Sequence, residues 1–239
     1  MRKRQIGVCI LAAIAALHSG LSSSSTACEP PGEFTAVYET TMDKVISLEG
    51  KGTQSLKKIA PDRYRFSFDV ESSVADMHES VEFTWSSEHC GILPVRYKNQ
   101  LKGFLIRDRL TEFELNDSNH FAGTYKGKAF SIPARSHYVD PLGLQVQVRE
   151  DLKSGKSEMA YHMIHKGKVL IDRYRVVGEE ILAVDGADLN TLKIEKVRPE
   201  SSDRETYLWM APDLDYTLVR ILHQEPDGER YEVSLSRLN

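Results

Sequence analysis

Alternation of apolar and polar side chains with a period of two constrains the fold of this chain more than any other feature. In residues 63–70, Tyr64, Phe66 and Phe68 fall on one side of an extended backbone, and charged or small polar residues fall on the other. Side chains of a strand point alternately to its two faces. The pattern therefore predicts a strand with one buried face.

Similar runs recur along the whole chain. They lie at residues 34–39, 81–85, 95–101, 104–109, 111–115, 159–164, 168–177, 189–197, 205–210, 218–223 and 230–238. Turn signals separate them, among them the glycine pair in residues 49–52 and the Pro-Asp-Gly of residues 225–229. We expect a mainly β fold, an antiparallel meander curved into a strongly bent sheet or an unclosed β-barrel.

Residues 140–155 depart from this alternation. The Asp-Pro pair at 140–141 is typical of an N-cap and the first helical position, and Gly155 is typical of a helix end. Leu142, Val146 and Leu152 would then share one face of a helix. The apolar residues at 144, 146 and 148 also alternate, so a strand is the alternative.

The first 27 residues have the order of a cleavable secretory signal. Three basic residues at positions 2–4 precede an apolar run at 6–17, and small residues at 25–27 precede the expected cut. The run is shorter than the roughly 20 residues that span a bilayer; an uncleaved anchor is the alternative. We expect export, a short linker at 28–33, one β-rich domain at 34–239, and no transmembrane segment after cleavage.

Cleavage would also change the charge and the cysteine count. Loss of three basic residues takes the formal net charge from −4 to −7, which argues against nucleic acid as a partner. Cys9 leaves with the signal, and an oxidising compartment would allow Cys28 to pair with Cys90. The alternatives are lipid attachment at Cys28, which the polar Ser25 three positions earlier disfavours, and two free thiols.

No motif predicts catalysis, a metal site or a cofactor. His162 and His165 are spaced by three in an expected strand, so they would point to opposite faces. Residues 88–90 place a histidine beside Cys90, but neighbours on a turn rarely face one another. Nucleophile-elbow and phosphate-loop patterns are absent from the sequence. We therefore expect a protein that is not an enzyme.

Aromatic residues dominate the faces that we expect to point inward. They are Tyr64, Phe66, Phe68, Phe83, Trp85, Phe104, Tyr161, Tyr207 and Trp209. Such residues either fill a core or line a concave sheet that is not fully filled and receives an apolar ligand. The residues alone leave both interpretations open.

Short motifs in the same order resemble a known family. They are the Leu-Trp-x-Ala-x-Asp of residues 208–213, with residues 34–38, 93–97, 140–142 and 174–182. They are similar to a bacterial periplasmic family, domain of unknown function 3108, across essentially the whole mature chain. Gly143 stands where that family often has serine. The family has no established catalytic residues.

The resemblance implies a relative of the lipoprotein-carrier fold, an unclosed curved sheet whose concave face is covered by a helix and holds acyl chains. The helical lid would comprise Asp140, Pro141, Leu142, Val146 and Leu152, and the aromatic residues above would line the cavity. The partner would be a lipid or lipoprotein in the periplasm. The alternative is a scaffold that binds other proteins of the cell envelope and has no ligand cavity.

Overall fold

The computed structural model describes residues 28–43, 47–104 and 108–239, so the signal peptide predicted at 1–27 lies outside the described residues. The described part of the chain forms 15 strands, one α-helix and one 3-10 turn. They are β1 (Phe34–Asp43), β2 (Ser47–Ala60), β3 (Arg63–Ser72), β4 (Ala75–Ser86), β5 (Gly91–Gly103), β6 (Arg109–Leu115), β7 (His120–Tyr125), β8 (Lys128–Pro133), β9 (Tyr138–Val139), α1 (Gly143–Lys153), β10 (Glu158–His165), β11 (Lys168–Val184), β12 (Ala187–Val197), β13 (Glu205–Ala211), η1 (Pro212–Leu214), β14 (Thr217–Gln224) and β15 (Arg230–Leu238).

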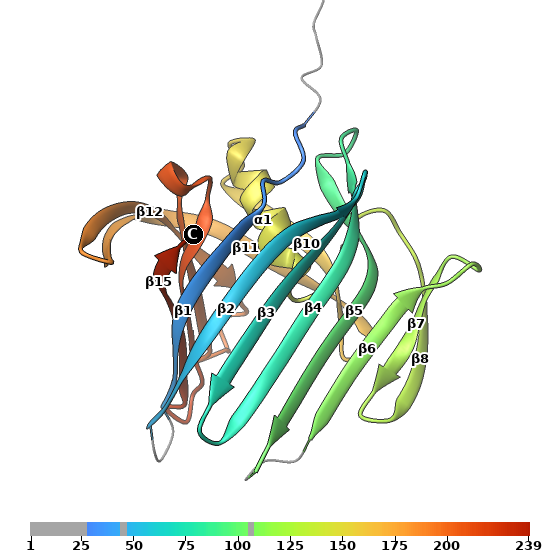
Figure 1. The fold of residues 1–239 in the computed structure, drawn as a ribbon, viewed down its shortest axis with the longest axis horizontal. Coiled ribbons are helices and arrows are strands. Elements are labelled where there is room, and N and C mark those ends of the chain that lie inside the picture. Colours follow the sequence, from blue (N-terminus) through green and yellow to red (C-terminus); the bar gives the residue numbers. More distant parts are fainter. Residues whose placement is uncertain (1–27, 44–46, 105–107) are drawn as a thin grey trace, which may run out of the picture.

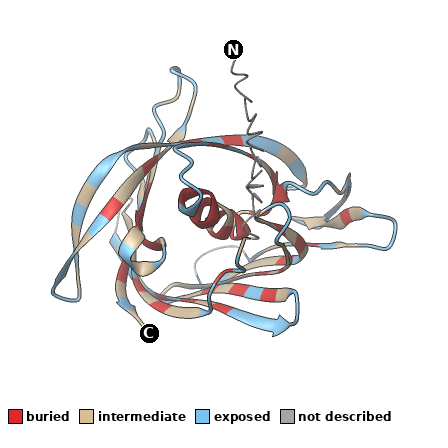
Figure 2. Cartoon of the chain, turned by 90° about the horizontal axis from the view of Figure 1, so that it is seen from above, coloured by how far each residue is buried: buried red, intermediate tan, exposed pale blue. Residues whose placement is uncertain are grey.

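The strands form a single sheet made of two meanders joined side by side. Its order runs from β8 through β7 to β1, then from β15 back to β9, so the first and last strands pair at its centre. Neighbours are antiparallel except β9 and β10. The sheet is strongly curved and α1 lies within its curve (Figures 1 and 2). The predicted unclosed β-barrel is confirmed.

The concave face, defined here as the face toward α1, is set by the pairing register. Residues directly opposite one another point the same way, as in Leu56 opposite Phe66 and Phe66 opposite Val81. All three side chains are buried. The alternation that predicted these strands therefore places the apolar set on the concave side, with its densest packing where α1 lies.

The turn predicted at residues 49–52 is wrong, because both of its glycines lie inside β2. Gly52 lies opposite Tyr38 on one neighbouring strand and opposite Val70 on the other. A Cβ atom at Gly52 would come within 2.5 Å of the Phe68 ring. The glycine therefore makes room for an aromatic ring that crosses the strand, which is a packing role that strand glycines often have.

Side chains close the curve where the hydrogen-bonded sheet ends. The Phe121 ring stacks on Tyr138 with centroids 6.4 Å apart, and Tyr138 stacks on His162 at 5.8 Å. A Cβ atom at Gly167 would lie 3.0 Å from the Phe130 ring. We call this contact of β7–β8 with β9, β10 and the β10–β11 turn the seam.

The sequence did not predict β7 or β8, because Gly123 and Gly127 interrupt a short alternation.

None of the helices in the described ranges has the length and apolar character needed to span a membrane.

Candidate functional site

The segment predicted as either a helix or a strand at 140–155 is helical, and α1 occupies Gly143–Lys153. Asp140 precedes it, and its Oδ1 accepts hydrogen bonds from the backbone N–H groups of Leu142 (3.0 Å) and Gly143 (2.8 Å). At the other end Gly155 has a φ of +83° and donates its N–H to Leu152 O at 2.9 Å. The glycine at the predicted end works as expected. The predicted start is two residues early, because α1 begins at Gly143 with Leu142 as its N-cap, so Pro141 is not its first residue and Asp140 bonds to the helix start from outside it.

α1 lies within the outline of the curved sheet, near one end of its strands (Figures 1 and 2). The residues of this segment that are buried include Leu142, Leu144, Val146, Val148, Arg149, Glu150, Asp151 and Leu152. Burial of both apolar and charged faces means that protein surrounds the helix on more than one side. The helix therefore fills one end of the concave face, and Pro141 beside it is half-buried.

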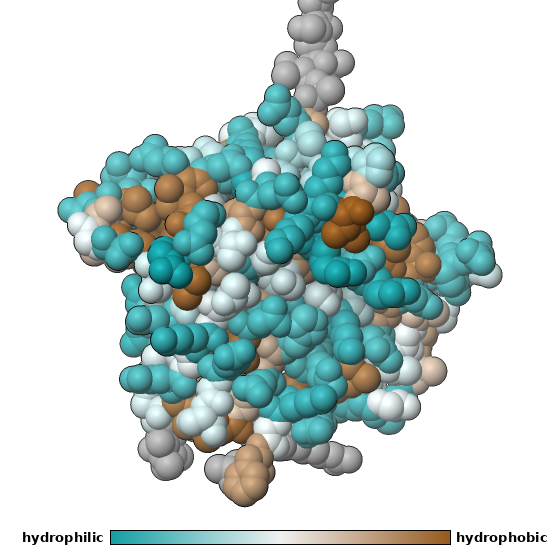
Figure 3. Space-filling model, viewed as in Figure 1, coloured by the Kyte–Doolittle hydropathy of each residue, from teal (hydrophilic) through white to brown (hydrophobic). Residues whose placement is uncertain are grey.

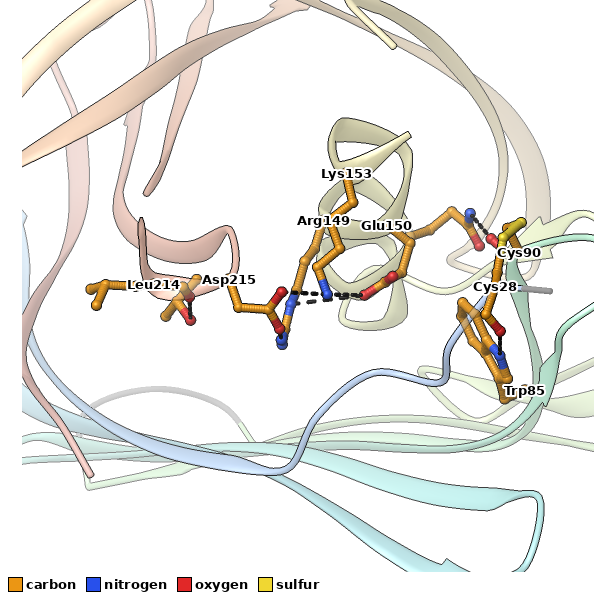
Figure 4. Close-up of polar contacts among 10 residues, drawn as sticks. Cys28, Trp85, Cys90, Arg149, Glu150, Lys153, Leu214 and Asp215 are labelled. Carbon is orange, nitrogen blue, oxygen red and sulfur yellow. Dashed lines mark hydrogen bonds and ion pairs between the residues drawn. A yellow bond between two sulfur atoms is a disulfide. The ribbon is translucent and has the colours of Figure 1, made fainter. Parts of the chain in front are cut away.

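A disulfide and one glutamine attach α1 to the N-terminal side of the fold (Figure 4). The structure joins Cys28 and Cys90 by a disulfide with Cα atoms 5.3 Å apart. Gln147 of α1 donates to Cys90 O at 3.0 Å and accepts from the Ile92 N–H at 3.1 Å. Trp85 donates its indole N–H to Cys28 O at 3.3 Å. The helix and Cys28 are therefore both held at the β4–β5 turn.

Asp151 attaches α1 to the opposite side of the fold. The Tyr161 hydroxyl of β10 donates to Asp151 Oδ2 at 2.8 Å, and Lys156 Nζ lies 2.7 Å from Oδ1. Burial, and then the Asp151 charge, raises the pKa of Tyr161 far above its usual value. Tyr161 therefore stays protonated and keeps its role as donor.

Asp140 is a fully buried carboxylate whose second oxygen has no hydrogen-bond partner among the described residues. Burial raises its pKa to about 7, and the charge of Glu79 adds to the increase. Glu79 accepts from the Tyr97 hydroxyl at 2.6 Å, and burial raises the Glu79 pKa also. A Cβ atom at Gly143 would lie 2.5 Å from Asp140 Oδ2. A side chain at position 143 would therefore collide with the Asp140 carboxyl group and with Ile92.

Two cations of α1 meet two carboxylates in an arrangement that the sequence did not predict. We call Arg149, Lys153, Glu150 and Asp215 the charge cluster (Figure 4). Arg149 Nη2 bonds to Asp215, and Lys153 Nζ lies 2.6 Å from Asp215 and 3.1 Å from Glu150. The Arg149 guanidinium lies over the Phe34 ring, 5.4 Å from its centroid. Burial lowers the pKa of Arg149, and the Glu150 charge opposes that shift.

Most of the predicted aromatic residues lie on the concave face. Tyr64, Phe66, Phe68, Phe83 and Tyr161 are buried, and Trp85 is half-buried. Tyr64 stacks on Phe83 with centroids 5.6 Å apart, and Phe68 meets Tyr38 edge to face at 6.0 Å. At the end that holds α1, these residues form a filled core.

The prediction that Phe104 points inward is wrong. Its side chain is 93% exposed. Of the strand predicted at 104–109, residues 105–107 lie outside the described ranges; β5 ends at Gly103, so Phe104 follows it, and β6 begins at Arg109.

Tyr207 and Trp209 also need correction, because they lie on the convex face. In β13 they alternate with Leu208 and Met210, and Met210 borders the same pocket as Val146 of α1. Trp209 is nevertheless only 2% exposed. Lys193 and Arg220 cover its ring at 5.2 and 5.0 Å, and its indole N–H donates to Glu180 at 2.7 Å. Cationic side chains, rather than the core, bury this ring.

The concave face beyond α1 is not fully covered. Apolar residues that the register turns inward there are half-buried: Met42, Val70, Met77, Leu101, Ile221 and Val233. A cleft of about 140 Å³ continues this surface into the seam, and we call it the seam cleft. Its apolar lining includes Tyr97, Leu101, Phe113, Phe130 and Ile164. In the described ranges no group of three or more His, Cys, Asp or Glu residues could hold a metal ion.

These features define a class of protein, a strongly curved and unclosed antiparallel β-barrel with one helix packed into its concave face. The chain belongs to the family described as Protein of unknown function (DUF3108), whose model matches residues 34–235. The resemblance drawn from the short motifs is thereby confirmed. No curated protein matches the chain in sequence.

The structural comparison matches solved proteins from several bacteria. A β-barrel-like protein of domain of unknown function DUF1849 from Brucella abortus is 9% identical, with a TM-score of 0.56 over 87% of this chain and 97% of its own. The lipoprotein LppX of Mycobacterium tuberculosis is 11% identical, with a TM-score of 0.27 over 87% of each chain. A DUF1329 family protein from Desulfovibrio piger is 11% identical, with a TM-score of 0.28 over 87% and 85%. Of these, the first supports a shared fold.

Proposed function

We propose that this protein is exported to the bacterial periplasm and binds the acyl chain of a lipid or lipoprotein along its concave face, without catalysis. The observation that carries the proposal is the set of half-buried apolar residues on that face beyond α1. Each CH₂ group removed from water there would contribute about 0.8 kcal/mol. A ligand held in this way needs few polar groups, in agreement with a sequence that has no catalytic motif.

The size of the seam cleft favours an extended ligand. Its volume of about 140 Å³ is well below the roughly 300–1,000 Å³ of pockets that enclose compact ligands. A single chain laid along the concave face and into the cleft fits this geometry better than an enclosed molecule.

The N-terminus supports release of the domain as a free protein. We propose that the signal at 1–27 is cut before Cys28, which leaves a linker at 28–33 and the domain at 34–239. One sulfur atom cannot hold both a disulfide and a thioether-linked lipid. The Cys28–Cys90 disulfide therefore supports an unanchored product over a lipid-anchored one.

Lipid extraction and a point variant test this function. Mass spectrometry of extracts from protein purified from its own envelope should find a stoichiometric lipid, and the delipidated protein should bind a fluorescent acyl probe. Leu101→Asp places a charge on the concave face and should abolish probe binding. Ile181→Asp is the control, since Ile181 is 66% exposed on the distant β11–β12 hairpin. No lipid and no probe binding by the folded wild-type protein would refute the function.

One surface favours the scaffold as a second candidate. Within the described residues, 180–191 of the β11–β12 hairpin pair only with each other. The hairpin extends from the body and exposes Val177 and Ile181 (Figures 1 and 3). An envelope protein could add a strand to its free edges. The scaffold would be supported if crosslinking captures one protein at a stoichiometric level and the extract contains no lipid. The Ile181→Asp variant should then lose the crosslink to that protein.

A further inference from the structure

The Arg149 side chain has hydrogen-bonding capacity that the described protein does not use. The side chain is 6% exposed, yet only its Nη2 donates, to Asp215. Nε and Nη1 have no hydrogen-bond partner in the described ranges, although Nε lies 3.8 Å from Glu150. An unpaired buried donor is costly, more so when it is charged. Its presence points to a ligand atom that would complete it.

A small pocket of about 20 Å³ adjoins this guanidinium. Its walls are mostly apolar and include Phe34, Phe66, Met210 and Leu218. Gln54, also in the lining, is buried and has an Oε1 without a partner among the described residues. The space holds about one water-sized group. A single polar atom of a ligand could therefore enter this space and bond to the guanidinium.

Asp215 is placed so that it can be exchanged for such a group. Its side chain is 55% exposed. Asp215 and Tyr216 have φ angles of 53° and 55°, in the left-handed region that residues with side chains rarely adopt. The turn therefore holds its carboxylate on Arg149 and Lys153 in a strained backbone conformation. On release, water would solvate the Asp215 carboxylate, whose side chain is already more than half exposed.

We propose that Arg149 and Lys153 form the head-group site for an amphiphile with one negative charge, a carboxylate or a phosphodiester, which takes the place of Asp215. The site rests on the function proposed above and adds the class of ligand. The charge cluster contains two cations and two carboxylates, so exchange of Asp215 for a monoanion keeps its charge balanced. A neutral head would leave both cations with Glu150 alone, and a cationic head would be repelled.

The geometry favours the ligand over Asp215 in one respect. Asp215 uses Nη2 of Arg149 and the ammonium of Lys153, and leaves Nη1 unpaired. A ligand oxyanion could accept from Nη1 and Nη2 together, which is the bidentate arrangement that a guanidinium prefers.

Three probes with the same dodecyl chain test the site by titration calorimetry on the mature protein. They are dodecanoate, methyl dodecyl phosphate and dodecanol, so the first two also tell which oxyanion is preferred. We expect the wild-type protein to bind at least one anionic probe roughly tenfold or more tightly than dodecanol, since hydrogen bonds to charged groups are the strong ones. Arg149→Gln should abolish that preference and leave dodecanol binding unchanged.

Asp215→Asn gives the decisive result, because it removes the competing carboxylate. It should strengthen binding of the anionic probe and leave dodecanol unchanged, whereas a purely structural Asp215 would give no gain. This variant decides the question even if Arg149→Gln fails to fold. Arg175→Gln is the control, since Arg175 is an exposed arginine paired with Glu195 on another part of the sheet.

The outcomes separate the two proposals. Equal binding of all three probes, or no gain in Asp215→Asn, overturns the head-group site and leaves the acyl-binding function standing. Failure of every probe to bind overturns both.

Discussion

At the scale of single residues, Asp140 combines a structural role with an electrostatic cost. Its Oδ1 satisfies two N–H groups at the start of α1, while Oδ2 lies fully buried without a partner in the described chain. An ionised carboxylate in such a place is expensive unless it takes up a proton. The start of the helix therefore depends on pH.

We expect Asp140 to make the protein less stable as the pH rises from about 4 to about 7. The Asp140 pKa is about 7 in the folded protein and about 3.9 in an unfolded chain, so the folded state binds more protons in this interval. Stability falls with pH wherever the folded state binds more protons than the unfolded state. Asp140→Asn keeps the Oδ1 acceptor and removes the titration.

Urea denaturation of both proteins across this interval measures the effect. The free energy of unfolding of the wild-type protein should fall by about 1–4 kcal/mol relative to that of Asp140→Asn. Burial also raises the pKa of Glu79, whose charge acts on Asp140, so the difference between the two proteins reports Asp140 together with its coupling to Glu79. Parallel pH curves for the two proteins would contradict the assignment.

At the scale of elements, α1 is held between two parts of the sheet that lie far apart in the sequence. Gln147 binds it to the β4–β5 turn beside the disulfide, and Asp151 binds it to Tyr161 of β10. The disulfide closes a loop of 62 residues. It therefore restrains the unfolded chain and also fixes the turn on which Gln147 depends.

Replacement of both cysteines, Cys28→Ser with Cys90→Ser, should lower the free energy of unfolding by about 2–4 kcal/mol. Guanidinium denaturation without reductant measures the loss. Addition of a reductant should destabilise the wild-type protein by a similar amount and leave the double variant unchanged, which is the control. A reductant effect of equal size on both proteins would show that the disulfide is not its cause.

The elements also show what the sequence could and could not predict. Residues 63–70 alternate cleanly because β3 buries Tyr64, Phe66 and Phe68 on one face, whereas β8 offers only the short alternation of Phe130 and Ile132, both half-buried. Aromatic residues predicted most of the concave face, but Trp209 is covered by cations from β12 and β14. Arg149 and Asp215 lie 66 residues apart. Contacts of this kind depend on the curve of the sheet, which no local pattern encodes.

At the scale of the whole molecule, backbone hydrogen bonds hold the sheet together everywhere except at the seam. There β8 pairs only with β7, and the rings of Phe121 and Phe130 provide the contact with β9, β10 and the β10–β11 turn. Side-chain contacts of this size are weaker than a strand ladder. The seam should therefore open at a lower free energy than the centre of the sheet, where β1 pairs with β2 and β15.

Hydrogen exchange should show this opening directly, and Phe130→Ala should enhance it. Phe130 packs edge to face on Phe113 at 6.2 Å, and its loss should lower the local stability of the seam by about 1–3 kcal/mol. Amides of β7 and β8 should then exchange roughly tenfold faster or more, while those of β1–β4 keep their rates. Phe104→Ala deletes the same ring from an exposed site and should change neither group. If Phe130→Ala instead speeds exchange equally across the whole sheet, the seam does not open as a separate unit. An acyl chain could then reach the seam cleft only through the open end of the concave face.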